Sequence, residues 1–217
     1  MENLIEKLKN PFDGLTKEEF QEKCSKIAKT LFNDYCINCN GKEFYLAEIE
    51  FYYWEKNKWD DKWNKVTYPR DGYNAGELFF HLSGYDICFE SSYGKSKFGG
   101  ILVRGMMDEN NEVIAGPLSC KDIILNTCRI GNMPLLKTMK RKRNWTPEVK
   151  PTNRLLGKGD MNNNIDGNLR LCFYDSKIFI DNWNPLKKRF DKDKGCEIER
   201  KGTYNVNRFK NDYRQPH

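Results

Sequence analysis

The stretch from Glu43 to Trp54 constrains the fold of this chain more than any other, because its residues alternate in character. Four of its side chains are of the kind that we expect in a core: Phe44, Leu46, Ile49 and the methyl group of Ala47. Glu48 and Glu50 are expected on the other face, with Tyr52 in the same register. This alternation predicts a β-strand with one packed face and one open face. An exposed strand with acidic decoration explains the pattern without any function, and a site is the alternative.

The preceding residues carry local signals for helices and a tight turn. Leu4–Leu8 is predicted as a short helix, and Thr16 with Glu19 forms a capping box at the start of a second helix. The apolar face of this second helix carries Phe20, Cys24, Ile27, Ala28 and Leu31. Asn40-Gly41 predicts a hairpin turn between a strand near Tyr35–Cys39 and the central strand.

The rest of the chain predicts more strands and two further helices. Strands are expected at Leu78–Leu82, Asp86–Phe89 and Phe98–Arg104, and a last hairpin at Leu169–Phe173 and Ile178–Ile180. One helix should begin around Gly116–Ser119 with Ser119 as its N-cap, and another should span Met133–Arg143. Without repeats or a clear linker, we expect one α+β domain over residues 1–217, with an N-terminal extension at 1–19 and a charged tail at 191–217.

Positive charge is concentrated in one part of the chain. The net charge is +6, and Lys137 to Lys158 contains eight basic residues against the single acid Glu148. Such a stretch suits the phosphates of a nucleic acid, although a solvated basic face is the alternative. A second mixed stretch, from Glu55 to Tyr73, interleaves Trp and Tyr with Lys and Arg. It is either a local aromatic cluster or a surface for base stacking and phosphate contacts.

Several classes of site and location are disfavoured by composition. The eight cysteines read as small buried side chains, and the lone pair Cys36 and Cys39 is weak evidence for zinc without a second pair. The only histidines are His81 and His217, which leaves histidine-based metal chemistry nearly without ligands. No apolar run approaches the length of a membrane span, and the N-terminus lacks an apolar signal region. We therefore expect a cytoplasmic protein with no membrane partner.

Several motifs, taken in order, resemble those of the alkyladenine (3-methyladenine) DNA glycosylase family. The similarity covers roughly residues 20 to 190 and rests on the order of the motifs, since each is loose alone. The matching segments are Ala47–Tyr52, Thr67–Arg70, Gly76–Glu90, Ile101–Arg104, Gly116-Pro117, Arg154–Gly159 and Leu169–Ile180. The resemblance implies a single mixed domain around a curved, barrel-like antiparallel sheet with flanking helices.

The resemblance also implies a chemistry and a set of site residues. The protein would be a monomeric, monofunctional DNA glycosylase that flips a modified base out of DNA and hydrolyses its N-glycosidic bond, without a cofactor. Glu50 would activate the water, and Arg104 would hold the phosphate or sugar of the flipped nucleotide. The substrate pocket would comprise Tyr52, Trp63, Asn64, His81, Tyr85 and Ser91. The DNA backbone would contact Arg70, Lys140, Arg141, Lys142, Arg143, Arg154 and Lys158.

Departures from the family pattern lie in the pocket. The family has a histidine about eleven residues after the catalytic glutamate, where this chain has Trp63 and Asn64 nearby. His81 stands where the family has a tyrosine, and the wedge tyrosine falls on Gly84 with Tyr85 next to it. The substrate is therefore either an alkylated or damaged purine, in repair, or a bulky hypermodified base of phage DNA, in defence.

Two other functions stay open. The chain could be a nucleic-acid-binding module without catalysis, but such a module has no need of a carboxylate such as Glu50 facing DNA. It could also be a small-molecule enzyme that uses Glu48 and Glu50 as an acid and base pair. That use would leave the basic stretch without a role.

Overall fold

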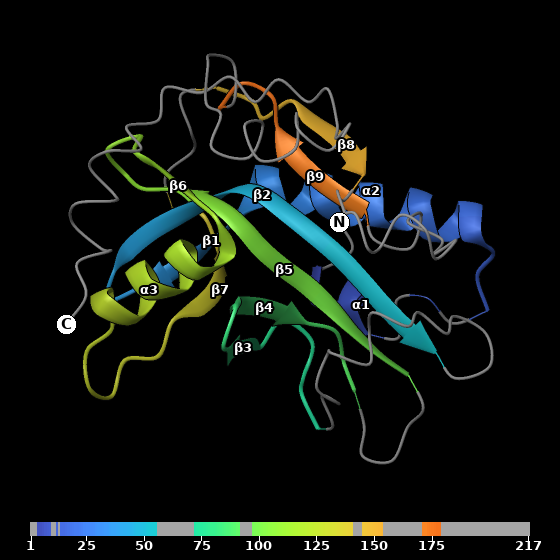
Figure 1. The fold of residues 1–217 in the computed structure, drawn as a ribbon, viewed down its shortest axis with the longest axis horizontal. Helices are drawn as coiled ribbons and strands as arrows, with labels where there is room; N and C mark the ends of the chain where they lie inside the picture. Colours follow the sequence, from blue (N-terminus) through green and yellow to red (C-terminus); the bar gives the residue numbers. More distant parts are fainter. Residues whose placement is uncertain are drawn as a thin grey trace, which may run out of the picture.

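The computed structural model describes residues 4–9, 12, 14–55, 72–91, 97–140, 145–153 and 171–178. These residues form an α+β fold in which a curled antiparallel sheet is flanked by a few helices (Figure 1). The helices are α1 (Leu4–Leu8), α2 (Lys17–Asp34) and α3 (Pro117–Thr127). The strands are β1 (Tyr35–Cys39), β2 (Lys42–Glu55), β3 (Leu78–His81), β4 (Gly84–Cys88), β5 (Lys97–Met107), β6 (Val113–Ala115), β7 (Leu135–Thr138), β8 (Val149–Asn153) and β9 (Leu171–Asp175).

Strand β2 organises the sheet, whose main order is β3-β4-β5-β2-β1-β7. One edge of β2 pairs with β5 over most of its length. Its other edge pairs first with β1 and then with β9, which pairs in turn with β8. All of these pairs are antiparallel, as expected for strands joined by short turns. The long pair β2 and β5 crosses the centre of Figure 1.

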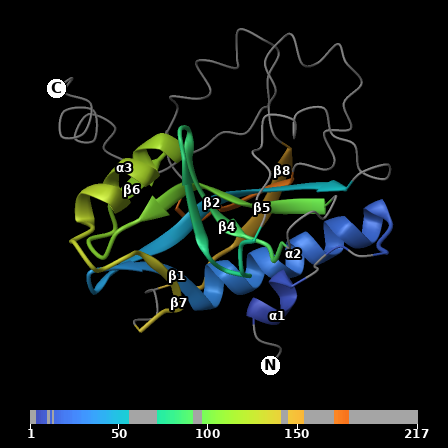
Figure 2. The ribbon, with the colours of Figure 1, turned by 90° about the horizontal axis from the view of Figure 1, so that it is seen from below.

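Helices α1 and α2 cover one face of this sheet, as Figure 2 shows from below. The predicted capping box is confirmed, because Glu19 N–H donates to Thr16 Oγ1 and Thr16 N–H donates to Glu19 Oε2. All five apolar residues predicted on the inner face of α2 are fully buried. Leu4, Leu8 and Phe12 join the same core cluster, so this part of the predicted N-terminal extension belongs to the core.

The hairpin that leads into β2 has the predicted bounds. Asn40 and Gly41 both have positive φ, 52° and 83°, which is the backbone twist that an Asn-Gly turn supplies. The two cysteines of β1 then point to different clusters. Cys39 belongs to the main core and Cys36 to a second, smaller cluster. Their spacing on a strand therefore separates the two thiols rather than bringing them together.

The prediction of an open face on β2 is wrong. Ile49, Phe51 and Tyr53 lie in the main core, as expected for one register of the strand. Glu48 and Glu50, in the other register, are each only 2% exposed. The alternation in the sequence therefore separates an apolar buried face from a charged buried face.

The predicted helix Met133–Arg143 is also wrong for its described part. Residues 135–138 form β7, which pairs antiparallel with β1. Pro134 disfavours helical backbone in the residue before it, and only Leu136 of the four strand residues packs against the core. A short apolar run of this kind fits a strand and a helix equally well until its partner is known.

Two smaller predictions, on the start of α3 and on the partner of β9, differ from the structure. Helix α3 begins after Gly116, with φ of 97°, and Pro117 is its first residue, so Ser119 lies inside the helix and is not its N-cap. Strand β9 pairs with β8 and β2, and Ile178, the one described residue of the second predicted strand, lies in a turn; residues 179 and 180 lie outside the described residues. This turn is held by Asp175, whose carboxylate accepts the N–H of Lys177.

Candidate functional site

A buried ion-pair cluster lies on the charged face of β2. Arg104 of β5 donates from Nε to Glu48 Oε1 at 3.1 Å and from Nη1 to Glu50 Oε2 at 2.7 Å. The Arg104 side chain is 17% exposed, whereas both glutamate side chains are 2% exposed. One guanidinium thus orients two carboxylates from the same strand. The two predicted catalytic residues, Glu50 and Arg104, are therefore in direct contact through a charge-assisted hydrogen bond.

Strand pairing fixes this cluster. Glu50 lies opposite Leu102 of β5, and the pairing register shifts at Glu48 and returns at Ile49. At the shift Glu48 lies opposite Gly105, where an added Cβ would be 3.2 Å from the Cβ of Glu48. A larger residue in place of Gly105 would push β2 away from β5 at Glu48, so the glycine permits the close approach of these two strands.

The electrostatics of the cluster are unusual for a protein interior. Burial lowers the pKa of Arg104, but the charges of Glu48 and Glu50 together offset this, so the pKa lies above its ordinary value. Arg104 therefore stays charged. Buried ion pairs seldom add to stability relative to apolar packing, so a cluster of this kind is a candidate functional site on physical grounds.

A third buried carboxylate, Asp86, belongs to the same face and was missed in the sequence. Asp86 of β4 lies opposite Leu102, which lies opposite Glu50, so the three residues form a row across adjacent strands. The Asp86 side chain is 1% exposed, and its Oδ2 lies 3.1 Å from His81 Nε2. No local signal marks a single aspartate in a strand, and only the cross-strand row reveals it.

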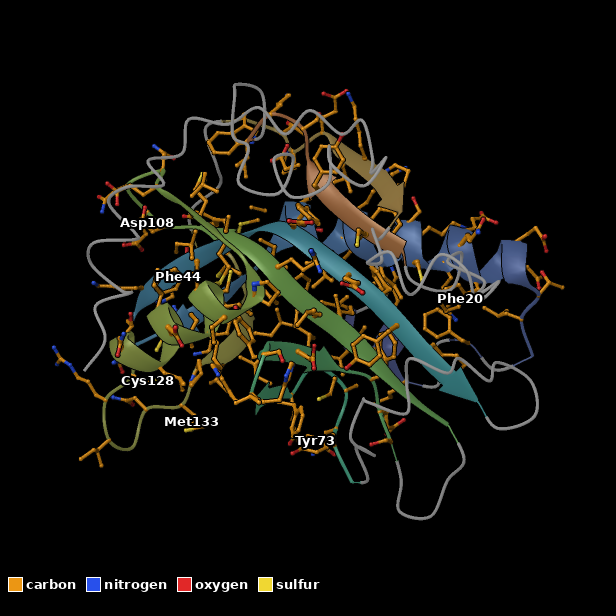
Figure 3. All side chains as sticks on the ribbon, viewed as in Figure 1. Phe20, Phe44, Tyr73, Asp108, Cys128 and Met133 are labelled. Carbon is orange, nitrogen blue, oxygen red and sulfur yellow. The ribbon has the colours of Figure 1, made fainter. Side chains whose placement is uncertain are left out.

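His81 has a defined hydrogen-bonding arrangement. The backbone N–H of Ser83 donates to His81 Nδ1 at 3.3 Å, so in the neutral ring the proton is on Nε2, the atom that faces Asp86. The His81 ring stacks on Phe79, with centroids 5.8 Å apart, and Tyr73 meets Phe79 edge to face. These three rings form an aromatic shelf beside β3, where Figure 3 labels Tyr73.

Two other predicted pocket residues lie near these elements. Tyr52 shares the register of Glu50, lies opposite Gly100 and is 5% exposed. Ser91 forms two hydrogen bonds with Tyr73 of the aromatic shelf: its Oγ accepts the N–H of Tyr73, and its own N–H donates to the Tyr73 carbonyl. We therefore assign Ser91 to holding Tyr73 in place.

The prediction that Tyr85 contacts substrate as a wedge is wrong. Tyr85 is fully buried in the main core, and its hydroxyl lies 2.8 Å from Met106 Sδ. The turn of the β3–β4 hairpin instead presents Leu82, which is 85% exposed. Lys121 of α3 fixes this turn, since its Nζ donates to the carbonyls of His81 and Leu82. Leu82 is thus an exposed apolar side chain on a braced turn.

The predicted DNA-backbone residues are mostly untested. Lys140 is exposed, and its backbone N–H donates to Glu43 Oε1 at 2.8 Å, which anchors the start of the basic stretch to the start of β2. The other predicted DNA-contacting residues and two pocket residues lie outside the described residues: Arg70, Arg141, Lys142, Arg143, Arg154, Lys158, Trp63 and Asn64.

Within the described ranges, no group of three or more His, Cys, Asp or Glu is arranged to hold a metal ion. Among the same residues, no helix combines the length and apolarity needed to cross a membrane. No model of a known protein family, no curated protein and no solved structure matches this chain.

Proposed function

We propose that this chain is a monofunctional DNA glycosylase that extrudes a modified base from DNA and hydrolyses its N-glycosidic bond. The observation that carries the proposal is the buried Arg104–Glu50 ion pair, which joins the two residues that the family resemblance assigns to catalysis. Buried charge without a stabilising purpose is typical of an active site. The basic stretch that begins at Lys137 supplies the attraction for phosphate.

In the proposed reaction, Glu50 removes a proton from a water molecule as that water attacks C1′ of the flipped nucleotide. The C1′–N bond breaks, the base leaves with the bonding electron pair and takes up a proton, and an abasic sugar remains. The negative charge of Glu50 also favours the positive charge that develops on the sugar. Arg104 keeps the Glu50 carboxylate in place and reaches toward the sugar or phosphate.

The neighbouring residues suit the other steps of this reaction. The aromatic shelf of Tyr73, Phe79 and His81 offers ring faces for stacking the extruded base. Asp86 accepts hydrogen bonds and would favour a base that carries an amino group or a positive charge. Leu82 would enter the space that the base leaves, because apolar side chains serve as wedges between base steps.

The aromatic shelf, Asp86 and Leu82 are compatible with both substrate classes, an alkylated or damaged purine and a bulky hypermodified base of phage DNA. An alkylated purine carries positive charge, and an amino group is common to adenine- and cytosine-type bases, including bulky modified cytosines of phage DNA. A carboxylate such as Asp86 is compatible with each of them and disfavours a carbonyl oxygen at the same position. Both a role in DNA repair and a role in defence against phage are therefore compatible with the proposed activity.

The test of the proposal is base release by Glu50→Gln. This variant keeps the shape of the side chain and removes its basicity, so it should bind target DNA at least as tightly as the wild type. Its single-turnover rate of base release should fall by at least about 100-fold, the low end for loss of a general base. The measurement is the rate of alkali-sensitive site formation at saturating enzyme on a panel of modified DNAs.

Glu48→Gln is the matched control, because Glu48 also pairs with Arg104 but lies two residues away on β2. Its loss of rate should be much smaller. Base release by Glu50→Gln at the wild-type rate would contradict the mechanism. If neither protein releases any base and both bind DNA tightly, the alternative of a non-catalytic nucleic-acid-binding module takes over.

A further inference from the structure

Two cysteines that are distant in sequence meet where the end of α3 lies against the β1–β2 hairpin. Cys39 is the last residue of β1, and Cys128 directly follows α3, where Figure 3 labels it. Their Sγ atoms are 3.2 Å apart across 89 residues of chain. The contact is a weak S–H···S hydrogen bond in the reduced protein, and it places the two thiols within reach of a covalent bond.

Backbone contacts hold both thiols in this arrangement. The N–H of Cys128 donates to the carbonyls of Ile124 and Leu125, which ends α3 at that residue. Asn40, next to Cys39 in the turn, donates from its side-chain amide to the carbonyl of Thr127. The Sγ atoms need to approach only from 3.2 Å to about 2.0 Å, which side-chain rotation and small backbone shifts can supply.

The two thiols differ in access. Cys39 is fully buried, and burial, with the adjacent Cys128 thiol as a smaller cause, raises the pKa of Cys39 to about 12. Cys128 is partly exposed. An oxidant in solution therefore meets Cys128 first, and Cys39 is the thiol placed to react with the product.

We propose that Cys39 and Cys128 are a modification site that forms a reversible disulfide when the protein meets a peroxide. In the first step the Cys128 thiolate attacks one peroxide oxygen, the O–O bond breaks, and Cys128 becomes a sulfenic acid while water leaves. In the second step the Cys39 sulfur attacks the Cys128 sulfur, the S–O bond breaks and a second water leaves. A dithiol reductant returns both thiols. This behaviour fits the transient, redox-sensing disulfides of reducing compartments.

The disulfide would act on the β3–β4 turn through α3. Helix α3 carries Lys121, which holds the carbonyls of His81 and Leu82 at that turn. A covalent bond at the C-terminal end of α3 restrains the helix, and so it restrains the turn. The inference needs only the geometry of the thiols and stands whether or not the protein excises bases.

The experiment treats the full chain with hydrogen peroxide and compares it with protein kept in a dithiol reductant. Peptide mapping by mass spectrometry should find Cys39 joined to Cys128, and thiol titration after denaturation should show the loss of two of the eight thiols. The melting temperature should rise by on the order of 5–10 °C, as expected for a disulfide that closes a long loop. Reductant should reverse each change.

Cys128→Ser should lose the cross-link and the rise in melting temperature, and Cys24→Ala, which removes a buried thiol of α2, should keep both. Peptide mapping of the wild type needs no variant, so a folding defect in either one leaves the test intact. The proposal is overturned if Cys128 pairs with another cysteine, or if it proceeds to sulfinic acid while Cys39 stays reduced. Hydrogen exchange at the Leu82 and Ser83 amides should slow on oxidation, and unchanged exchange would refute the link to the turn.

Discussion

The two faces of β2 are equally buried and chemically opposite. On one face Ile49, Phe51 and Tyr53 pack into the core beneath the sheet. On the other face, Glu48 and Glu50 share Arg104. Burial of apolar side chains stabilises a fold by about 25 cal/mol per Å² removed from water, whereas burial of charges costs energy that ion pairing roughly returns. The first face therefore supplies most of the stability of the sheet, whereas the second contributes little net stability.

A large loss of stability is expected when the apolar face of β2 is broken. Phe51 is fully buried and meets Phe173 edge to face, so Phe51→Ala should lower the free energy of unfolding by about 3–5 kcal/mol. Denaturant unfolding measures this. Glu50→Gln, one residue away, serves as the control and should cost much less stability. Equal losses for the two variants would mean that both faces stabilise the fold.

Removing the charges as a set sharpens the comparison. Arg104→Met alone leaves two buried carboxylates without their cation and should cost about 3–5 kcal/mol of unfolding free energy. Replacing Glu48, Glu50 and Arg104 together by Met should be neutral or stabilising by about 1–4 kcal/mol, while base release disappears. Thermal and denaturant unfolding of both variants give the answer. A triple variant as unstable as the single one would make the cluster structural.

A smaller effect should follow from Asp86→Asn, which tests whether the charged face extends to β4. If Asp86 reads the base, the variant should lose about 10- to 100-fold in kcat/KM on amino-bearing bases, as expected when a buried partner is left unpaired. Its effect on carbonyl-bearing bases should be slight or opposite. Relative excision rates on paired substrates measure the change. An equal loss on all bases would assign Asp86 only to holding His81.

The smallest effect on chemistry should come from the basic stretch. Replacing Lys140, Arg141, Lys142 and Arg143 by Ala should weaken binding to all DNA sequences alike and make the salt dependence shallower, by up to about one unit per lost contact. Base release at saturating enzyme should change little. Lys23, Lys26 and Lys29 on α2 are the control, since that helix covers the apolar face. If both sets of substitutions weaken DNA binding equally, the basic stretch acts only through the overall charge of the protein and not as a specific DNA contact.

The features that the sequence predicts correctly are those set by near neighbours in the chain. Thr16 and Glu19 form their capping box, and Asn40-Gly41 forms its turn, because each depends on residues within a few positions. The alternation from Glu48 to Tyr53 also separates a charged face from an apolar face, although the charged face is buried and not open. Glu50 and Arg104, chosen through the family resemblance for separate roles, form an ion pair in the structure, a contact that the resemblance did not predict.

The features that were mispredicted depend on distant partners. Leu135–Thr138 becomes a strand because β1 offers it an edge, which no local pattern reveals. Tyr85 is drawn into the core by the register of β4, which leaves Leu82 at the exposed turn. Asp86 gains its meaning only from its row with Glu50 across β5. Burial of Glu48 and Glu50 likewise comes from tertiary packing and not from their own strand.

The double-sided burial of β2 restricts how this gene can vary over evolutionary time. Successive strand residues point to opposite sides, so an insertion or deletion of one codon within the strand would exchange the sides of every residue beyond it. Glu48 and Glu50 would then point into the hydrophobic core, and Ile49 and Phe51 would point to the face that now holds Arg104. Related genes should therefore differ in this stretch by substitution or by even-numbered length changes, while single-codon length changes collect in the turns.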